Sequence, residues 1–238
     1  MKKLFFVLIA AFSLINMAHA QPVVNDPLAE KRTVGSFHAI DVSTGIEVFL
    51  SEGSTEELAV SASAVEYRDK IITRLENGIL RIYFENKLNI NTKHVQRELK
   101  VYVSFKNIDK IEASTGSRVK IMDVLKSPEL IIHATEGAEI NGKVSSAHLQ
   151  VKQNTGSRIT LEGDAASFEG EGDTGSKFTG AELITNSCHV KVSTGAIISI
   201  NADKELSAKA NTGGVIRYKG SPEMKEINRN TGGVITKI

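Results

Sequence analysis

The chain has 238 residues, a formal net charge of +1 at pH 7 and 24% charged residues. This balance excludes the strong basic bias of proteins that bind nucleic acids or anionic lipids through their overall charge, so we expect no nucleic-acid partner. Aromatic residues make up only 5% of the chain and tryptophan is absent, which excludes a surface of aromatic rings that stacks bases or sugars.

The first twenty residues have the pattern of a secretory signal peptide. Two lysines precede an apolar run from Leu4 to Ile15, and Ala18 and Ala20 lie just before Gln21, at a typical cleavage site. The apolar run is too short to span a membrane, so we expect no membrane span. The mature protein is therefore predicted to be exported, to the periplasm, the cell surface or the medium.

After the predicted signal peptide, the sequence predicts a short lead-in followed by one domain. Residues 21–36 are polar and contain two prolines, which predicts a flexible lead-in. Apolar alternation begins at Phe37. We expect one β-solenoid domain over 37–238, irregular over 37–112 and regular over 113–238.

The irregular part carries signals for short local elements. Asn77-Gly78 lies between the apolar segments Ile71–Leu75 and Leu80–Phe84, and this arrangement is a strong signal for a β-hairpin. The segment Ser63–Glu66 has the pattern of a capping box, which predicts one or two helical turns. Residues 88–96 are mostly polar and predict a loop.

A short turn recurs along the second half of the chain, as in Asn154-Thr155-Gly156-Ser157, and an outlying copy lies near residue 45. Within the regular part its glycine returns every 18 to 21 residues, and such a period indicates a solenoid. A tight corner requires positive φ at the glycine, and we expect the preceding threonine to be extended. The turn glycines are Gly45, Gly116, Gly137, Gly156, Gly175, Gly195, Gly213 and Gly232.

Residues at odd offsets from these glycines are mostly apolar or small, and residues at even offsets are mostly polar. The position three residues after the glycine is apolar in every regular turn: Val119, Ile140, Ile159, Phe178, Ile198, Ile216 and Ile235. The alternation predicts two short strands per coil, each with one buried face, and coils stacked about 4.8 Å apart. The predicted fold class is all-β, a single-stranded parallel β-helix that is right-handed by the general rule for parallel crossovers.

Several segments carry a resemblance to a known family. They are Phe37–Val42, Gly45–Leu50, the Asn77-Gly78 hairpin and the final Gly232-Gly233-Val234, together with the serial Thr-Gly turns. With them the whole mature chain resembles the putative autotransporter adhesin, head GIN domain family, exported proteins of unknown function common in Bacteroidetes. The resemblance implies a pectin-lyase-like solenoid and a role in adhesion, and it brings no catalytic residues.

One coil carries the most suggestive acidic segment, with Glu169, Glu171 and Asp173 predicted to point outward from one strand. Such a group is compatible with a Ca²⁺ site or with a glycoside hydrolase. The alternative is a cross-strand charge ladder, because Lys152 and Lys191 occupy the position of Glu171 in the coils before and after it. The ladder explains the pattern without a ligand and is the interpretation we prefer.

The remaining reactive residue types point to packing or to solvent. The only cysteine, Cys188, shares an apolar column with Leu149, Phe168 and Leu206, which predicts a packing role rather than a nucleophile. The histidines do not pair at metal-ligand spacing. We therefore expect no catalytic residue, no cofactor and no metal ligand.

An apolar stripe is predicted on the outer surface of the last coils. Two residues after the glycine, the column changes from charged residues to Ile197, Val215 and Val234. A stacked apolar stripe at outward positions usually indicates a contact. Three occupants are open: the N-terminal part or the tail of the same chain, a second copy, or a foreign partner.

Three functions follow from these observations. The first is a non-enzymatic exported adhesion or binding module with a glycan, envelope or matrix ligand. The second is a polysaccharide lyase or hydrolase, in which Glu169, Glu171 and Asp173 are the only candidate carboxylates. The third is a structural envelope protein that self-assembles as a homo-oligomer.

Overall fold

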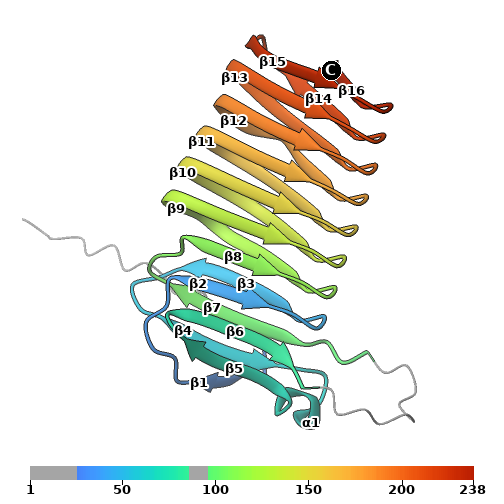
Figure 1. Ribbon diagram of the computed structural model, residues 1–238. Coiled ribbons are helices and arrows are strands. Elements are labelled where there is room, and N and C mark those ends of the chain that lie inside the picture. Colours follow the sequence, from blue (N-terminus) through green and yellow to red (C-terminus); the bar gives the residue numbers. More distant parts are fainter. Residues whose placement is uncertain (1–25, 86–95) are drawn as a thin grey trace, which may run out of the picture.

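The computed structural model describes residues 26–85 and 96–238, and its coils stack into an elongated solenoid (Figure 1). The predicted signal peptide, residues 21–25 of the lead-in and most of the loop predicted over 88–96 lie outside the described residues. The described strands are joined into one hydrogen-bonded sheet with parallel neighbours in the coils. The prediction of an all-β parallel β-helix is confirmed.

The elements fall into an N-terminal part and a regular part. The N-terminal part contains β1 (Glu30–Arg32), β2 (Ala39–Val42), β3 (Glu47–Glu52), β4 (Glu57–Ser61), α1 (Val65–Arg68), β5 (Ile71–Glu76), β6 (Ile79–Phe84), β7 (Lys100–Phe105) and β8 (Lys110–Ala113). The regular part contains β9 (Arg118–Ala134), β10 (Glu139–Gln153), β11 (Arg158–Gly172), β12 (Lys177–Val192), β13 (Ile197–Ala210), β14 (Val215–Lys219), β15 (Glu223–Arg229) and β16 (Val234–Lys237).

Each coil from β9 to β13 is one long strand of 14 to 17 residues. The prediction of two short strands per coil is wrong here, because the hydrogen-bond ladder continues around the second corner of the coil. Register shifts lie at this corner, for example between Asn141 and Lys143 and between Thr160 and Glu162. An irregularity of this kind bends a strand without ending its pairing.

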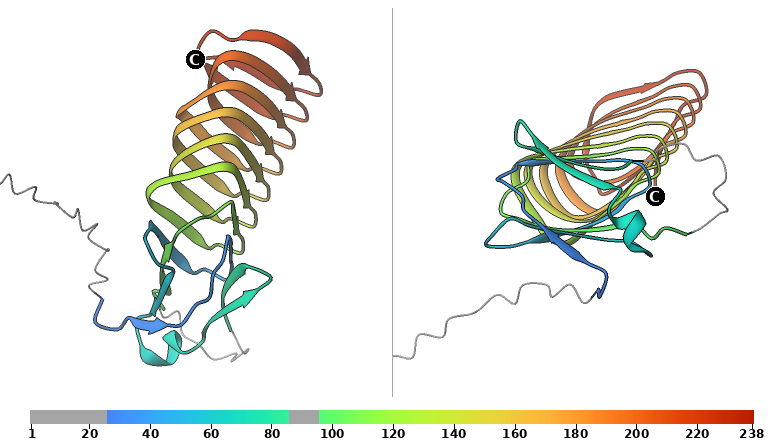
Figure 2. Two further views of the ribbon diagram at one scale, coloured as in Figure 1. Left: turned by 90° about the vertical axis from the view of Figure 1, so that its left-hand side faces the viewer. Right: turned by 90° about the horizontal axis from the view of Figure 1, so that it is seen from below.

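The interior column predicted from the sequence is confirmed. Val119, Ile140, Ile159 and their equivalents are register partners on successive coils, and every member of the column is at most 7% exposed. Seen along the solenoid, the coils overlie one another around a shared interior (Figure 2). Each side chain therefore packs on the equivalent side chain of the next coil, which is the contact that holds a solenoid together.

Two phenylalanines fill the middle of this interior. The rings of Phe168 and Phe178 stack with their centroids 5.1 Å apart. Glycines leave room for them, because a Cβ at Gly170 would lie 2.7 Å from the Phe168 ring and one at Gly180 would lie 2.5 Å from the Phe178 ring.

The Thr-Gly turns are type I′ turns. In the central example φ is +50° at Thr155 and +69° at Gly156, and the Ser157 N–H donates to the Asn154 carbonyl over 3.2 Å. The expectation of an extended threonine is wrong. The left-handed conformation persists because the turns also bond along the solenoid: the Gly156 N–H donates to the Thr174 carbonyl of the next coil over 3.0 Å.

The N-terminal part covers one end of the solenoid with antiparallel strands. The hairpin predicted at Asn77-Gly78 is confirmed, since β5 and β6 pair antiparallel around it. The helical turn forms, but its N-cap is Ala64, without a side-chain cap bond, and the Ser63 hydroxyl instead donates to the Gln96 carbonyl. Within the predicted lead-in, residues 30–32 form β1, which pairs antiparallel with β4.

Candidate functional site

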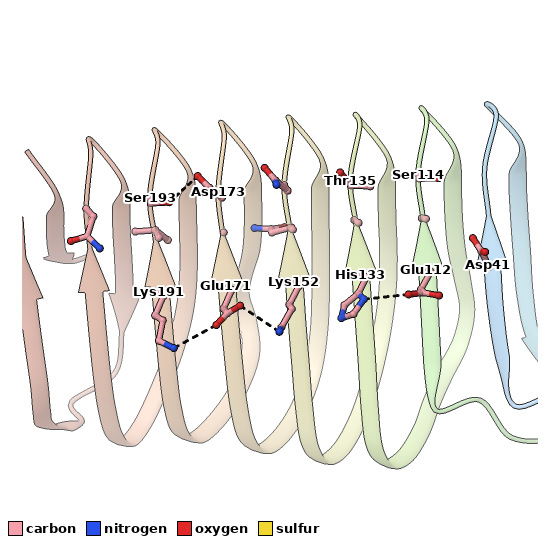
Figure 3. Close-up of a pocket in the computed structure, with 17 residues that line it drawn as sticks. Asp41, Glu112, Ser114, His133, Thr135, Lys152, Glu171, Asp173, Lys191 and Ser193 are labelled. Carbon is pink, nitrogen blue, oxygen red and sulfur yellow. Dashed lines mark hydrogen bonds and ion pairs between the residues drawn. The ribbon is translucent and has the colours of Figure 1, made fainter. Parts of the chain in front are cut away.

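A groove of about 800 Å³ crosses the coils parallel to the solenoid axis, between the ends of the strands and the projecting turns (Figure 3). One wall, here called the strand row, is formed by Asp41, Glu112, His133, Lys152, Glu171 and Lys191. The other wall, here called the turn row, is formed by Ser114, Thr135, Asn154, Asp173, Ser193 and Asn211. The register places six coil steps between Asp41 and Asn211, or about 29 Å at about 4.8 Å per step.

The alternation of a β-strand creates both walls. Residues four and two positions before each turn glycine point outward, and the residue between them points into the core. The intervening residues include Ala134, Gln153 and Val192, which are buried, so the floor of the groove is largely backbone. That backbone is already hydrogen-bonded between coils, as where the Asn154 N–H donates to the Ala134 carbonyl over 3.0 Å.

Charges in the strand row are paired along the solenoid axis. Glu171 contacts two lysines: Lys152 Nζ lies 3.6 Å from one carboxylate oxygen and Lys191 Nζ lies 3.5 Å from the other. Glu112 Oε1 lies 2.9 Å from Lys110 Nζ on its own strand and 3.4 Å from His133 Nδ1, which makes an ion pair only when it is protonated. The predicted cross-strand ladder is confirmed. Exposed pairs of this kind contribute about 0.2–1 kcal/mol each, so they order the surface more than they stabilise the fold.

The structure separates the three carboxylates of the acidic segment. Glu171 belongs to the strand row and Asp173 to the turn row, whereas Glu169 lies outside the groove and accepts a bond from Gln150 Nε2 over 3.3 Å. Within residues 26–85 and 96–238 no cluster of three or more His, Cys, Asp or Glu side chains is placed to hold a metal ion.

The one cysteine is part of the core. Cys188 is 2% exposed, and its sulfur lies 2.6 Å from the Thr185 hydroxyl. Burial raises the pKa of the Cys188 thiol to about 11, so the reactive thiolate is scarce near neutral pH. These observations agree with the packing role predicted from its column.

Comparison with other proteins decides the family. A search of curated proteins gave no match. A family model described as "Putative auto-transporter adhesin, head GIN domain" matches residues 36–222. The chain belongs to this family. The resemblance read from the sequence is confirmed.

Solved structures share the fold of this chain. A putative adhesin from Bacteroides fragilis is 19% identical, with a TM-score of 0.80 over 88% of this chain and 96% of that one. A putative adhesin from Parabacteroides distasonis is 15% identical, with a TM-score of 0.70 over 88% and 96%. A structure from the same species described as a putative lipid binding protein is also 15% identical, with a TM-score of 0.67 and the same coverage. At these identities the likeness concerns the fold alone.

Sequence reasoning missed the groove and its N-terminal end. Asp41 and Glu112 are register partners in the strand row, so two carboxylates adjoin there. Burial, and then the charge of Glu112, raise the pKa of Asp41 above its ordinary value, although Arg81 Nη1 lies 3.2 Å from its carboxylate. The signal was available, because Asp41 stands four residues before Gly45 as Glu112 stands four before Gly116.

Asp173 gives a pH-dependent prediction. Hydrogen bonds from the Thr194 and Ser193 hydroxyls and the Thr174 N–H hold the pKa of its carboxyl below the ordinary value of 3.8. A lowered native pKa adds stability above the unfolded pKa, and this stability is lost as the pH falls through the native pKa. Asp173→Asn removes this term, so we expect the variant to lose less stability than the parent between about pH 6 and about pH 2 in urea unfolding.

The substitution keeps the local geometry, since asparagine occupies the same turn position at Asn154 and accepts a bond from the following N–H over 2.7 Å. Equal slopes of unfolding free energy against pH for parent and variant would contradict the prediction.

The N-terminal part does not cover the apolar stripe, because it lies at the opposite end of the solenoid (Figure 1). Ile197, Val215 and Val234 are register partners on the last coils. Val234 is 46% exposed, and Ile197 and Val215 are half-buried. Of the expected occupants, the described residues of the N-terminal part do not cover the stripe, whereas the tail, a second copy and a foreign partner all stay predictions.

That prediction is tested by the double variant Ile197→Lys with Val215→Lys. Both side chains are partly exposed, so we expect the fold to survive and the oligomeric mass in analytical ultracentrifugation to fall. The matched control places lysines at Thr179 and Ser199, which are uncharged register partners in the neighbouring outward column. An oligomeric mass unchanged by the stripe variant counts against the interface.

None of the helices within the described ranges, 26–85 and 96–238, is long and apolar enough to cross a membrane.

Proposed function

We propose that the protein is an exported, non-enzymatic binding module that presents the groove face of its solenoid for adhesion. The observation that supports this most is that charged side chains in the groove are held by ion pairs and hydrogen bonds to neighbouring residues. Both carboxylate oxygens of Glu171 contact lysines, and Asp173 accepts bonds from Ser193 and from the Thr174 N–H. A surface whose polar groups are fixed by a repeated backbone binds without reorganising, which reduces the entropic cost of association.

The same contacts argue against catalysis by the acidic segment. A general acid needs a carboxyl group that holds its proton near the working pH. The pKa of Asp173 is lowered, and Glu171 lies between two cations. Glu169 lies outside the groove, so the three residues do not form the facing pair that glycoside hydrolysis requires.

Binding and turnover are measured on the same material. The mature protein is applied to an array of glycans and matrix proteins, and every glycan that binds is then incubated with it in the presence of Ca²⁺ and assayed for new reducing ends and unsaturated products. We expect binding without product. Release of product in proportion to protein concentration would replace the adhesion proposal with the lyase or hydrolase alternative.

A further inference from the structure

We propose that the groove binds an uncharged polysaccharide that lies along the solenoid axis, across the coils. This inference rests on the proposed function and names the ligand class of the same surface. Its basis is the chemistry of the two walls and the floor, considered in turn below.

The walls repeat donors and acceptors at the spacing of the coils. The turn row offers hydroxyl, amide and carboxylate groups, as at Thr135, Asn154 and Asp173, and the strand row offers ammonium and carboxylate groups, as at Lys152 and Glu171. A sugar hydroxyl both donates and accepts, so a chain of sugars can use either kind of group at each step. A periodic polymer also suits a periodic surface, because many weak contacts add along one chain.

The floor disfavours a peptide. Peptides in extended grooves usually add a strand to a free sheet edge and place side chains in apolar pockets. Here the backbone of the floor is already paired between coils, as in the bond from the Asp173 N–H to the Gln153 carbonyl over 3.0 Å. The apolar side chains beneath it, such as Val192 and Ala134, are at most 3% exposed and point into the core.

The charges disfavour a polyanion. A surface that binds a polyanion usually carries an uninterrupted run of positive charges. In the strand row the two lysines are both paired with Glu171, and two more carboxylates, Asp41 and Glu112, lie toward the N-terminal end. The groove therefore carries charges of both signs and does not concentrate positive charge.

The test uses the mature chain with soluble neutral polysaccharides (mannan, dextran and xyloglucan) and with one anionic polysaccharide, polygalacturonate, in affinity electrophoresis and calorimetry. We expect at least one neutral polysaccharide to bind, with little dependence on salt. Thr135→Arg places a long side chain in the groove and should weaken that binding by at least about tenfold. Thr160→Arg makes the same change at an exposed outward position of β11 away from the groove and should leave binding unchanged.

A second variant tests the charge argument. Glu171→Gln keeps the shape of the side chain but releases Lys152 and Lys191 from their ion pairs. We expect it to gain salt-sensitive binding of polygalacturonate, which the parent lacks. Thermal melts of all variants confirm that they are folded.

The outcomes separate the two proposals. If a ligand of another class binds and Thr135→Arg removes it, the binding module stands and the neutral-polysaccharide inference is overturned. If a neutral polysaccharide binds equally to the parent and to Thr135→Arg, the groove is not its site, which also overturns the inference. If no array component binds the folded parent, both proposals fail.

Discussion

Replacing Phe178 with alanine is expected to lower the free energy of unfolding by about 3–5 kcal/mol. The Phe178 ring is fully buried and stacks on Phe168 at 5.1 Å. The cavity left behind cannot close easily, because the backbone on either side is held by parallel pairing to β11 and β13. Urea unfolding followed by circular dichroism measures the loss, and hydrogen exchange should rise first in β11, β12 and β13.

The matched control lies on the same strand. Ile184 is 58% exposed, so Ile184→Ala also truncates an apolar side chain to alanine, but at the surface, and should change the unfolding free energy by less than about 0.5 kcal/mol. Similar losses for the two variants would show that the interior column does not carry the stability of the coils.

Gly163→Ala is expected to cost about 3 kcal/mol or more, the combined effect of backbone strain and overpacking. Gly163 lies at the corner of β11 with φ of +109°, and a Cβ there would overlap the Val144 carbonyl oxygen of the preceding coil. Neither the glycine nor its neighbour can move freely, because they are register partners in the parallel ladder. Urea unfolding of the purified variant measures the cost.

Gly156→Ala is the corresponding change in a Thr-Gly turn. Gly156 has φ of +69°, and nothing lies within 4 Å of the position that a Cβ would take. Only the left-handed conformation is penalised there, at about 1–2 kcal/mol. If both alanine variants lose the same stability, the contact with the Val144 carbonyl is not what makes the corner of β11 sensitive.

The regular coils were predictable because their information is local and repeated. The glycine period and the alternation between odd and even offsets together fix which side chains are buried, and the column from Val119 to Ile235 follows from them. Two predictions failed because hydrogen bonds between coils outweigh local preference. The bond to the next coil holds Thr155 in a left-handed conformation, and continued pairing keeps each coil from β9 to β13 a single strand.

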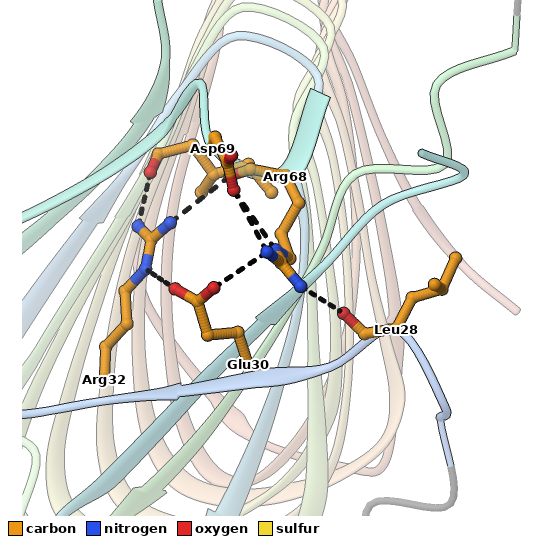
Figure 4. A network of polar contacts seen from close by, with 6 residues as sticks. Leu28, Glu30, Arg32, Arg68 and Asp69 are labelled. Atoms are coloured by element: carbon orange, nitrogen blue, oxygen red, sulfur yellow. Dashed lines mark hydrogen bonds and ion pairs between the residues drawn. The ribbon is translucent and has the colours of Figure 1, made fainter. Parts of the chain in front are cut away.

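The N-terminal part was harder to predict because long-range contacts hold its polar residues (Figure 4). Arg68 Nη2 lies 2.9 Å from Glu30 Oε2, and Arg68 Nη1 donates to the Leu28 carbonyl over 3.4 Å. Arg32 donates to the Ile71 and Arg68 carbonyls. A polar, proline-containing segment looks flexible on its own, but these bonds dock β1 on the region of α1 and β5.

The ion pairs of the candidate site could be predicted from the sequence, but the groove could not. The Lys152–Glu171–Lys191 ladder follows from the offset count, because stacking brings equal offsets together. The groove depends on how far the turns project from the strands. This projection is set by the type I′ turn and by the hydrogen bond from the N–H of each turn glycine to the next coil. No single residue type in the sequence reports that projection.

The repeated register of the coils has a consequence for how such molecules vary. Each coil presents the same edge to the one above as to the one below, with bonds between strands and between turns at equivalent positions. Adding or deleting one whole coil therefore leaves strand edges that can still pair on both sides of the insertion or deletion. The length of the molecule can change independently of its cross-section, and the groove would lengthen or shorten by one step with each coil.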